Sequence, residues 1–106
     1  MDIVEAANSL AALGNTTRIS LYRLLVRAGD EGLNMGEIQG RLMVPASTLS
    51  HHVGALVQAG LIVREKHGRE IICVANYAAM HAVVDYLTAE CCLGFEAPNK
   101  ETDTGT

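Results

Sequence analysis

Two adjacent cysteines near the end of the sequence, Cys91 and Cys92, carry its most reactive side chains. Neighbouring Cα atoms lie about 3.8 Å apart, so the two sulfur atoms can meet wherever the backbone leaves a rigid helix. Soft thiolates bind soft, thiophilic centres such as trivalent arsenic or antimony. The third cysteine, Cys73, is either a further ligand or a small buried strand residue, and we favour the buried role. The sequence therefore predicts a thiol site at Cys91 and Cys92.

A second set of polar side chains has the types and spacing that bind DNA. Small hydroxyl residues and a histidine stand at the front of a helical segment after Pro45, and basic residues gather in the strand–turn–strand pattern that follows. Such a helix fits a DNA major groove while a basic hairpin contacts the flanking backbone. The predicted DNA contacts are Ser47, Thr48, Ser50, His51, Arg41, Arg64, Lys66, His67 and Arg69.

The distribution of charge along the chain supports DNA binding better than the net charge does. The net charge of −4 argues against DNA binding if it is taken globally. Residues 41–69, however, hold four Lys and Arg against one Glu, and residues 93–106 are net acidic. DNA binding needs a local basic face and not a basic protein. Because the face is modest, we expect weak non-specific binding with a shallow salt dependence.

Hydrophobic periodicity and capping residues place these side chains on elements. We predict helices over 2–13, 16–28, about 35–42, 45–59 and 77–92, strands over 61–66 and 70–74, and a turn at His67-Gly68. Asn15 or Thr16 caps the second helix, and Asn34 caps the third in a capping box. Residues 1–92 form one domain, and residues 93–106 a flexible tail. The predicted buried side of the second helix consists of Ile19, Leu21, Leu24, Leu25 and Ala28. The apolar stripe of the helix over 45–59 consists of Leu49, Val53, Leu56 and Val57, and one side of the last helix carries Tyr77, Met80, Val84, Leu87 and Cys91.

Composition excludes several classes of protein. The chain of 106 residues has no apolar run near the length of about 20 that crosses a membrane. Its N-terminus carries acids where a signal peptide needs bases, so we expect a cytoplasmic protein with reduced thiols. We find no nucleophile–base pair, phosphate loop or acid dyad, and therefore do not expect an enzyme.

Three groups of residues form motifs in the order of the predicted elements. Leu13-Gly14-Asn15-Thr16-Thr17-Arg18-Ile19 resembles the opening L-A-D-P-T-R signature of the ArsR family of metal- and thiol-responsive repressors. Residues 47–53, with Leu56 and Ala59-Gly60-Leu61-Ile62, resemble its recognition helix, and Gly68-Arg69 resembles its wing tip. The resemblance covers roughly residues 5–92.

The resemblance implies a mainly α fold with a small β-hairpin, a winged helix–turn–helix in the order ααααββα. It further implies a homodimer joined by the first and last helices, which binds double-stranded operator DNA at an inverted repeat. The spacing of Cys73, Cys91 and Cys92 is similar to that of the branch that senses trivalent organoarsenicals through a vicinal pair. The implied inducer is therefore As(III) or an organoarsenical, with no catalytic cofactor. Two thiolates suit methylarsenite, whereas a third ligand at Cys73 would suit arsenite.

The chain also departs from the family pattern. Asn34-Met35-Gly36 replaces the Cys-x-Cys of the third-helix thiol site, and only His81 and Asp85 remain of the last-helix zinc site. Ala46, His51 and Gly54 replace larger polar or basic residues along the recognition helix, so binding should depend strongly on the wing.

Some of these residues also have purely structural interpretations. Ser47 can act as a helix cap as readily as it contacts DNA. His52 is expected to pack and form a hydrogen bond inside the protein, and Arg18 to form a structural salt bridge.

Two other functions stay open. The chain can be a repressor of the same family that responds to thiol oxidation, to persulfides or to another metal. Persulfide sensors of that family, however, pair distant cysteines on the second and last helices. From a different class, it can be a winged-helix module that binds a protein partner without a ligand. DNA binding to its own promoter separates this last function from a repressor.

Overall fold

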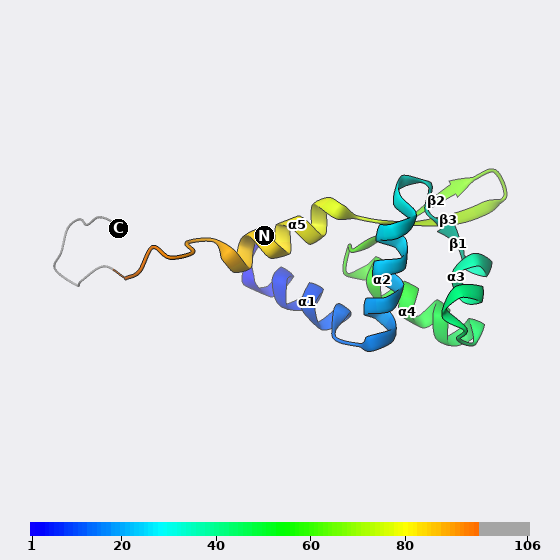
Figure 1. The fold of residues 1–106 in the computed structure, drawn as a ribbon, viewed down its shortest axis with the longest axis horizontal. Helices are drawn as coiled ribbons and strands as arrows, with labels where there is room; N and C mark the ends of the chain where they lie inside the picture. Colours follow the sequence, from blue (N-terminus) through cyan, green and yellow to red (C-terminus); the bar gives the residue numbers. More distant parts are fainter. Residues whose placement is uncertain (96–106) are drawn as a thin grey trace.

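Five α-helices and one antiparallel sheet make up residues 1–95, the part of the chain that the computed structural model describes (Figure 1). The predicted tail over 93–106 therefore falls outside the described residues apart from its first three positions. In chain order the elements are α1 (Ile3–Leu13), α2 (Thr16–Ala28), the 3₁₀ turn η1 (Gly29–Glu31), β1 (Leu33–Asn34), α3 (Met35–Leu42), α4 (Ala46–Gln58), β2 (Ile62–His67), β3 (Glu70–Ala75) and α5 (Tyr77–Thr88).

Side-chain caps fix the starts of the first three helices. Asp2 and Glu5 form a reciprocal capping box at α1, and Asn34 and Glu37 form another at α3. The side chain of Asn15 accepts a hydrogen bond of 3.1 Å from the Arg18 amide at the start of α2. Each contact satisfies a backbone N–H that has no partner within the helix. The predicted caps at Asn15 and Asn34 are thus confirmed.

The sheet has three strands in the order β1-β3-β2, one more than the sequence predicted. β1 is only two residues long, which is too short for an alternating pattern to reveal it. In the β2–β3 hairpin His67 pairs with Glu70, so the turn is Gly68-Arg69 and the predicted turn at His67-Gly68 is wrong by one residue. Gly68 has a φ of 65°, the left-handed value that the first turn position of such hairpins favours.

Gly32 lets β1 approach β3. Its φ is 63°, and a Cβ atom built there would lie 2.4 Å from the carbonyl oxygen of Cys73 and 2.7 Å from a methyl group of Ile72. No side chain fits at this distance, so the close approach of the chain to β3 just before β1 needs a glycine.

An aliphatic core joins the three middle helices to the sheet. The predicted stripe of α4 is confirmed, because Leu49, Val53 and Leu56 are at most 1% exposed and Val57 packs beside them. The stripe of α2 is confirmed at Leu21 and Leu25. The prediction that Ile19 is buried is wrong, since 46% of this residue is exposed.

The last helix is shorter than predicted, and part of the apolar side that the sequence indicates for it is exposed. It ends at Thr88 with Ala89 in the cap position, so it neither reaches residue 92 nor stops at Gly94. Thr88 turns its hydroxyl back onto the carbonyl of Val84, 2.8 Å away, and β-branched residues propagate helices poorly. Val83 is buried, whereas Val84 and Leu87 of the predicted stripe are 49% and 57% exposed.

Within residues 1–95, no helix combines the length and the apolar composition needed to cross a lipid bilayer.

Candidate DNA-binding surface and vicinal thiol pair

The front of α4 presents the predicted base-reading side chains to solvent. Ser47, Thr48, Ser50 and His51 are all exposed, while Leu49 between them is buried. The 3.6-residue period brings the four together on the first turns of one helix. Pro45 occupies the N-cap position without a side-chain hydrogen bond. The structural role of Ser47 as the cap is therefore wrong, because this residue already lies inside the helix.

His52, beside this exposed face, is an internal residue as predicted. Only 9% of it is exposed, and its Nδ1 accepts a hydrogen bond of 2.9 Å from Nε of Arg18. Burial, then the positive charge of Arg18 and the nearby His51, lower the pKa of His52. Arg18 also donates to the carbonyl oxygen of Ala12 at 3.3 Å. The salt bridge predicted for Arg18 is wrong, since its partners are a neutral ring and a backbone oxygen.

The wing exposes all four of its predicted DNA contacts, but on two different faces. Arg64 and Lys66 are two residues apart on β2 and share one face of the strand. His67 lies on the other face, with its Nε2 atom 3.2 Å from a carboxylate oxygen of Glu65. Glu65 thus offers His67 an internal partner, which strand periodicity can reveal and which the sequence analysis did not consider. Arg69 stands at the tip of the hairpin.

Two asparagines that cap helices also connect the elements of this surface. Asn34, the cap of α3, also donates a hydrogen bond of 3.0 Å to the Glu70 carboxylate at the base of the wing tip. Asn76 caps α5 through Oδ1 and donates through Nδ2 to the carbonyl oxygen of Gly60, 2.9 Å away. The end of α4 is therefore hydrogen-bonded to the start of α5.

Cys91 and Cys92 lie in a turn just beyond α5, with their Sγ atoms 3.0 Å apart. The prediction that the two sulfur atoms converge outside a rigid helix is confirmed. Left-handed backbone at Glu90 and Cys92, with φ of 65° and 68°, produces the turn. The hydrogen bond with Cys92, and to a lesser degree desolvation, raise the pKa of Cys91. Both thiols are exposed and accessible to a ligand.

Cys73 is fully buried in β3, which is the role that the sequence analysis favoured for it. Its Sγ lies 4.0 Å from the thioether sulfur of Met35. Burial raises the pKa of Cys73 against a smaller opposite effect of Arg64. Over the described range, no three His, Cys, Asp or Glu side chains gather as a metal site. The structure thus brings Cys91 and Cys92 together. Neither Cys73 nor the pair His81 and Asp85 lies with them as a further ligand.

Comparison with known proteins agrees with this architecture. Residues 13–65, half of the chain, match the family described as "Helix-turn-helix domain". A putative arsenical resistance operon repressor ArsR of Halobacterium salinarum is 42% identical over 60 residues, which cover 57% of this chain and 46% of that protein. The matched segments span about half the length of this relative and of a second arsenical repressor from the same organism.

Solved structures extend the likeness over about four fifths of the chain. An ArsR-like transcriptional regulator from Rhodococcus sp. RHA1 has a TM-score of 0.72 and 30% identity, covering 79% of this chain and 76% of the other. A homodimeric winged helix-turn-helix domain from Mycobacterium bovis shares the fold with a TM-score of 0.67 at 20% identity, over 83% of this chain and 82% of the other. The architecture is that of transcriptional regulators and not of enzymes. The chain belongs to the ArsR family of winged helix-turn-helix regulators.

Proposed function

We propose that this chain is a DNA-binding transcriptional repressor that a trivalent arsenical, bound by Cys91 and Cys92, releases from its operator. The observation that carries the ligand proposal is the 3.0 Å contact between two exposed sulfur atoms. The likeness to repressors named for arsenical resistance supports the same class of inducer. The repressor is proposed to act in the cytoplasm, where thiols stay reduced.

In this proposal residues 1–92 form the DNA-binding and dimerisation domain. The exposed face of α4 reads base edges, and the wing and Arg41 contact the phosphate backbone. The hydroxyls of Ser47, Thr48 and Ser50 discriminate bases less strongly than a bidentate side chain does, so backbone contacts supply much of the affinity. The proposed contacts are Ser47, Thr48, Ser50, His51, Arg41, Arg64, Lys66, His67 and Arg69.

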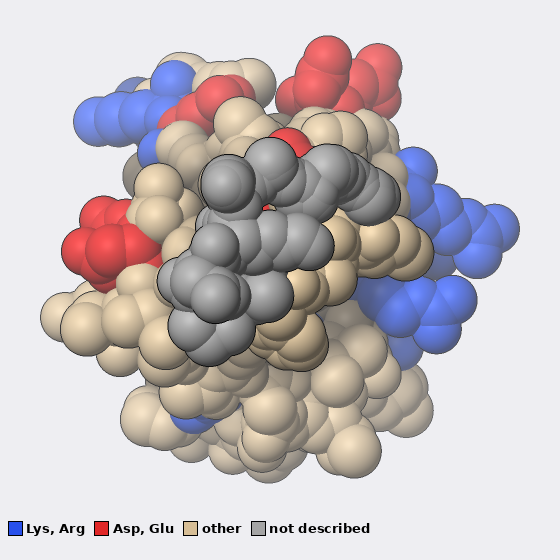
Figure 2. Space-filling model, turned by 90° about the vertical axis from the view of Figure 1, so that its left-hand side faces the viewer, with Lys and Arg blue, Asp and Glu red and all other residues tan. Residues whose placement is uncertain are grey.

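The proposed subunit interface is the apolar surface of α1 and α5, which pack side by side (Figure 1). Ile3, Val4 and Leu10 of α1 and Val84 and Leu87 of α5 are between 43% and 69% exposed in the single chain. Charged side chains lie mainly at the edges of the visible part of this end (Figure 2). Exposed apolar patches of this kind mark association surfaces. A homodimer would present two recognition helices to successive major grooves of an inverted repeat.

The number of As–S bonds that each arsenical can form decides which inducer we propose. Methylarsenite, CH₃As(OH)₂, reacts with two thiols to form two As–S bonds and releases two water molecules. Arsenite can form a third bond to sulfur, which the buried Cys73 does not supply near the pair. The hydrogen bond with Cys92 raises the pKa of Cys91. Each thiol proton leaves with a departing hydroxide as water. The site therefore suits an organoarsenical better than arsenite.

Release of the operator can follow because Cys91 and Cys92 lie directly after α5, a helix of the proposed subunit interface. A dithiolate ring around arsenic would fix the turn after α5, at the edge of the proposed interface. At its other end α5 is joined to α4 by the hydrogen bond from Asn76 to Gly60. A change in the packing of α5 would thereby alter the angle between two recognition helices. A coupling of about 1–3 kcal/mol weakens operator binding roughly 5- to 150-fold.

Operator affinity measured by fluorescence anisotropy tests the proposal, with methylarsenite, phenylarsenite, arsenite, zinc or cadmium added. We expect release with the two organoarsenicals and little with zinc. Cys91→Ser/Cys92→Ser should still bind the operator and no longer respond, while Cys73→Ser should respond normally. A normal response of the double variant would refute the thiol site, and loss of response in Cys73→Ser would favour a three-thiol arsenite site.

The same contact favours a second candidate, a redox-responsive repressor. Two thiols 3.0 Å apart can lose two electrons and two protons to hydrogen peroxide, forming a vicinal disulfide and two water molecules. Operator release by peroxide, reversed by dithiothreitol, together with no response to organoarsenicals, would favour this function. If the dimer binds no DNA from its own promoter in a gel shift, a protein-interaction module becomes the better proposal.

A further inference from the structure

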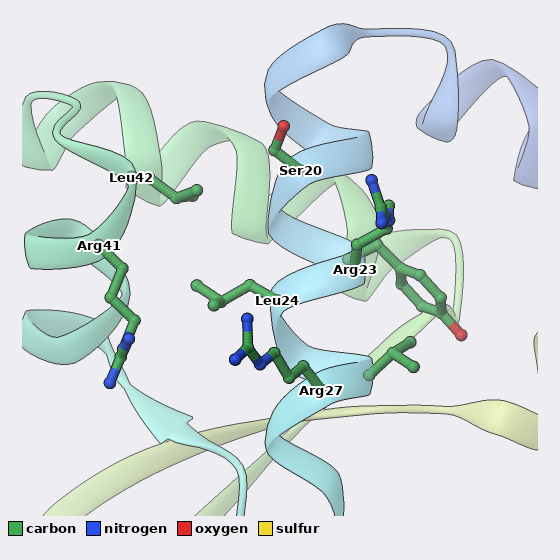
Figure 3. Close-up of a pocket in the computed structure, with 8 residues that line it drawn as sticks. Ser20, Arg23, Leu24, Arg27, Arg41 and Leu42 are labelled. Atoms are coloured by element: carbon green, nitrogen blue, oxygen red, sulfur yellow. The ribbon is translucent and has the colours of Figure 1, made fainter.

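A depression of about 570 Å³ lies between α2 and α3, away from the thiol pair (Figure 3). Its lining combines apolar and strongly basic side chains. Leu24 and Val26 of α2 and Leu42 of α3 supply apolar surface, and Arg23, Arg27 and Arg41 supply guanidinium groups.

The side chains are arranged so that one ligand could contact both kinds of group. Leu24 and Leu42 point toward each other from the two helices, and the guanidinium of Arg27 turns toward the same space (Figure 3). Arg41 descends along the α3 side, and Arg23 is one helical turn from Arg27. Two guanidinium groups thus flank an apolar floor formed by leucines.

Within residues 1–95, the three arginines have no internal counter-ion. No carboxylate there lies within salt-bridge distance of Arg23, Arg27 or Arg41, and the one histidine–carboxylate contact joins His67 to Glu65. Three like charges on one groove repel each other, and a bound anion would relieve that repulsion. The guanidinium fork matches the oxygen atoms of a carboxylate or phosphate.

We propose that this groove binds an oxyanion carried on a short apolar body, that is, an alkyl or aryl carboxylate or phosphate. Arg27 and Arg41 would hold the oxyanion, and Leu24 and Leu42 would cover the apolar part. The volume lies within the range of small-molecule sites. An inorganic anion would leave the leucines uncovered, and an apolar molecule without charge would leave the arginines unpaired.

The site does not depend on the proposed arsenical response, and its test uses no DNA. The full chain is titrated in NMR amide-shift experiments with decanoate, phenyl phosphate, inorganic phosphate and decyltrimethylammonium. We expect saturable shifts at residues 20–27 and 41–42 with decanoate or phenyl phosphate only. Tighter binding of decanoate would identify an alkyl carboxylate as the ligand class. Tighter binding of phenyl phosphate would identify an aryl phosphate.

A matched pair of variants assigns the binding to the groove. Arg27→Gln should weaken oxyanion binding about tenfold, the effect of losing roughly one charge-assisted hydrogen bond. Arg69→Gln on the wing, a proposed DNA contact outside the groove, removes the same charge and should leave oxyanion binding unchanged. Arg27→Lys, which keeps the charge without the fork, should fall between them. Equal binding of inorganic phosphate or of decyltrimethylammonium, no shift with either oxyanion, or equal effects of Arg27→Gln and Arg69→Gln would each overturn the proposal.

Discussion

Nε of Arg18 donates a hydrogen bond of 2.9 Å to Nδ1 of His52, which ties the first turn of α2 to the middle of the proposed recognition helix. The bond needs a neutral imidazole, because a protonated ring offers no acceptor at Nδ1. His52 lies next to His51, one of the proposed base contacts. The orientation of the DNA-reading face therefore depends on a buried contact that acid can break.

Acid is expected to destabilise the domain through His52. Its pKa is lowered in the folded chain, mainly by burial. The contribution of the neutral ring is therefore complete above the unfolded pKa of about 6.5 and is lost as pH falls toward the lower folded value. Urea unfolding between pH 5 and 8 should show a loss of stability on acidification that is smaller in His52→Gln. The reasoning is wrong if the variant and the native chain lose stability equally.

Gly32 is expected to tolerate no side chain. In Gly32→Ala the new Cβ would meet the Cys73 carbonyl in a left-handed backbone, so we expect a loss of about 2–4 kcal/mol in unfolding free energy. The matched control is Gly40→Ala in α3, where nothing lies within 4 Å of the added atom. That change should stabilise the chain by about 0.5–1 kcal/mol. Chemical denaturation of both variants measures the contrast, and similar values for the two would contradict it.

Removal of the Tyr22 hydroxyl is expected to stabilise the protein. This hydroxyl is the one buried side-chain oxygen or nitrogen of residues 1–95 without a hydrogen-bond partner. Burial, and then the nearby Tyr77, raise its pKa. Tyr22→Phe keeps the ring and removes an unsatisfied polar group, which should raise the unfolding free energy by about 1 kcal/mol. A lower thermal midpoint in the variant would show that the hydroxyl has a partner in solution.

Asn76 is expected to couple the thiol pair to the DNA-binding surface. Asn76→Ser keeps an oxygen that can cap α5 but loses the bond from Nδ2 to the Gly60 carbonyl. If the proposed repressor mechanism holds, methylarsenite should still bind with unchanged stoichiometry, and its effect on operator affinity should shrink several-fold. Mass spectrometry measures the first quantity and anisotropy the second. Full release in the variant would exclude Asn76 from the coupling.

The salt dependence of DNA binding separates the two faces of the wing. Arg64 is exposed on the face of β2 that also carries Lys66, whereas His67 already lies against Glu65. Arg64→Gln should reduce the slope of log affinity against log salt by about one, because one phosphate contact is lost. His67→Gln should change that slope little. The reverse order would place the DNA on the His67 face.

The sequence by itself determined the class of this protein and most of its elements. The caps at Asn15 and Asn34 and the apolar stripe of α4 are local patterns, set by neighbours within about four residues. The β2–β3 pair follows from two β-rich segments joined by a short turn. The adjacency of Cys91 and Cys92 is likewise covalent, so their candidate role could be seen in the sequence.

Tertiary structure decided which surfaces and partners those elements acquire. Strand β1 exists only because β3 passes beside it, and the bond from Arg18 to His52 joins residues 34 positions apart. The exposure of Ile19 and the burial of Val83 depend on how neighbouring elements pack against the helices. Periodicity shows that a helix has an apolar side, but packing against a particular neighbour decides which residues on that side leave water.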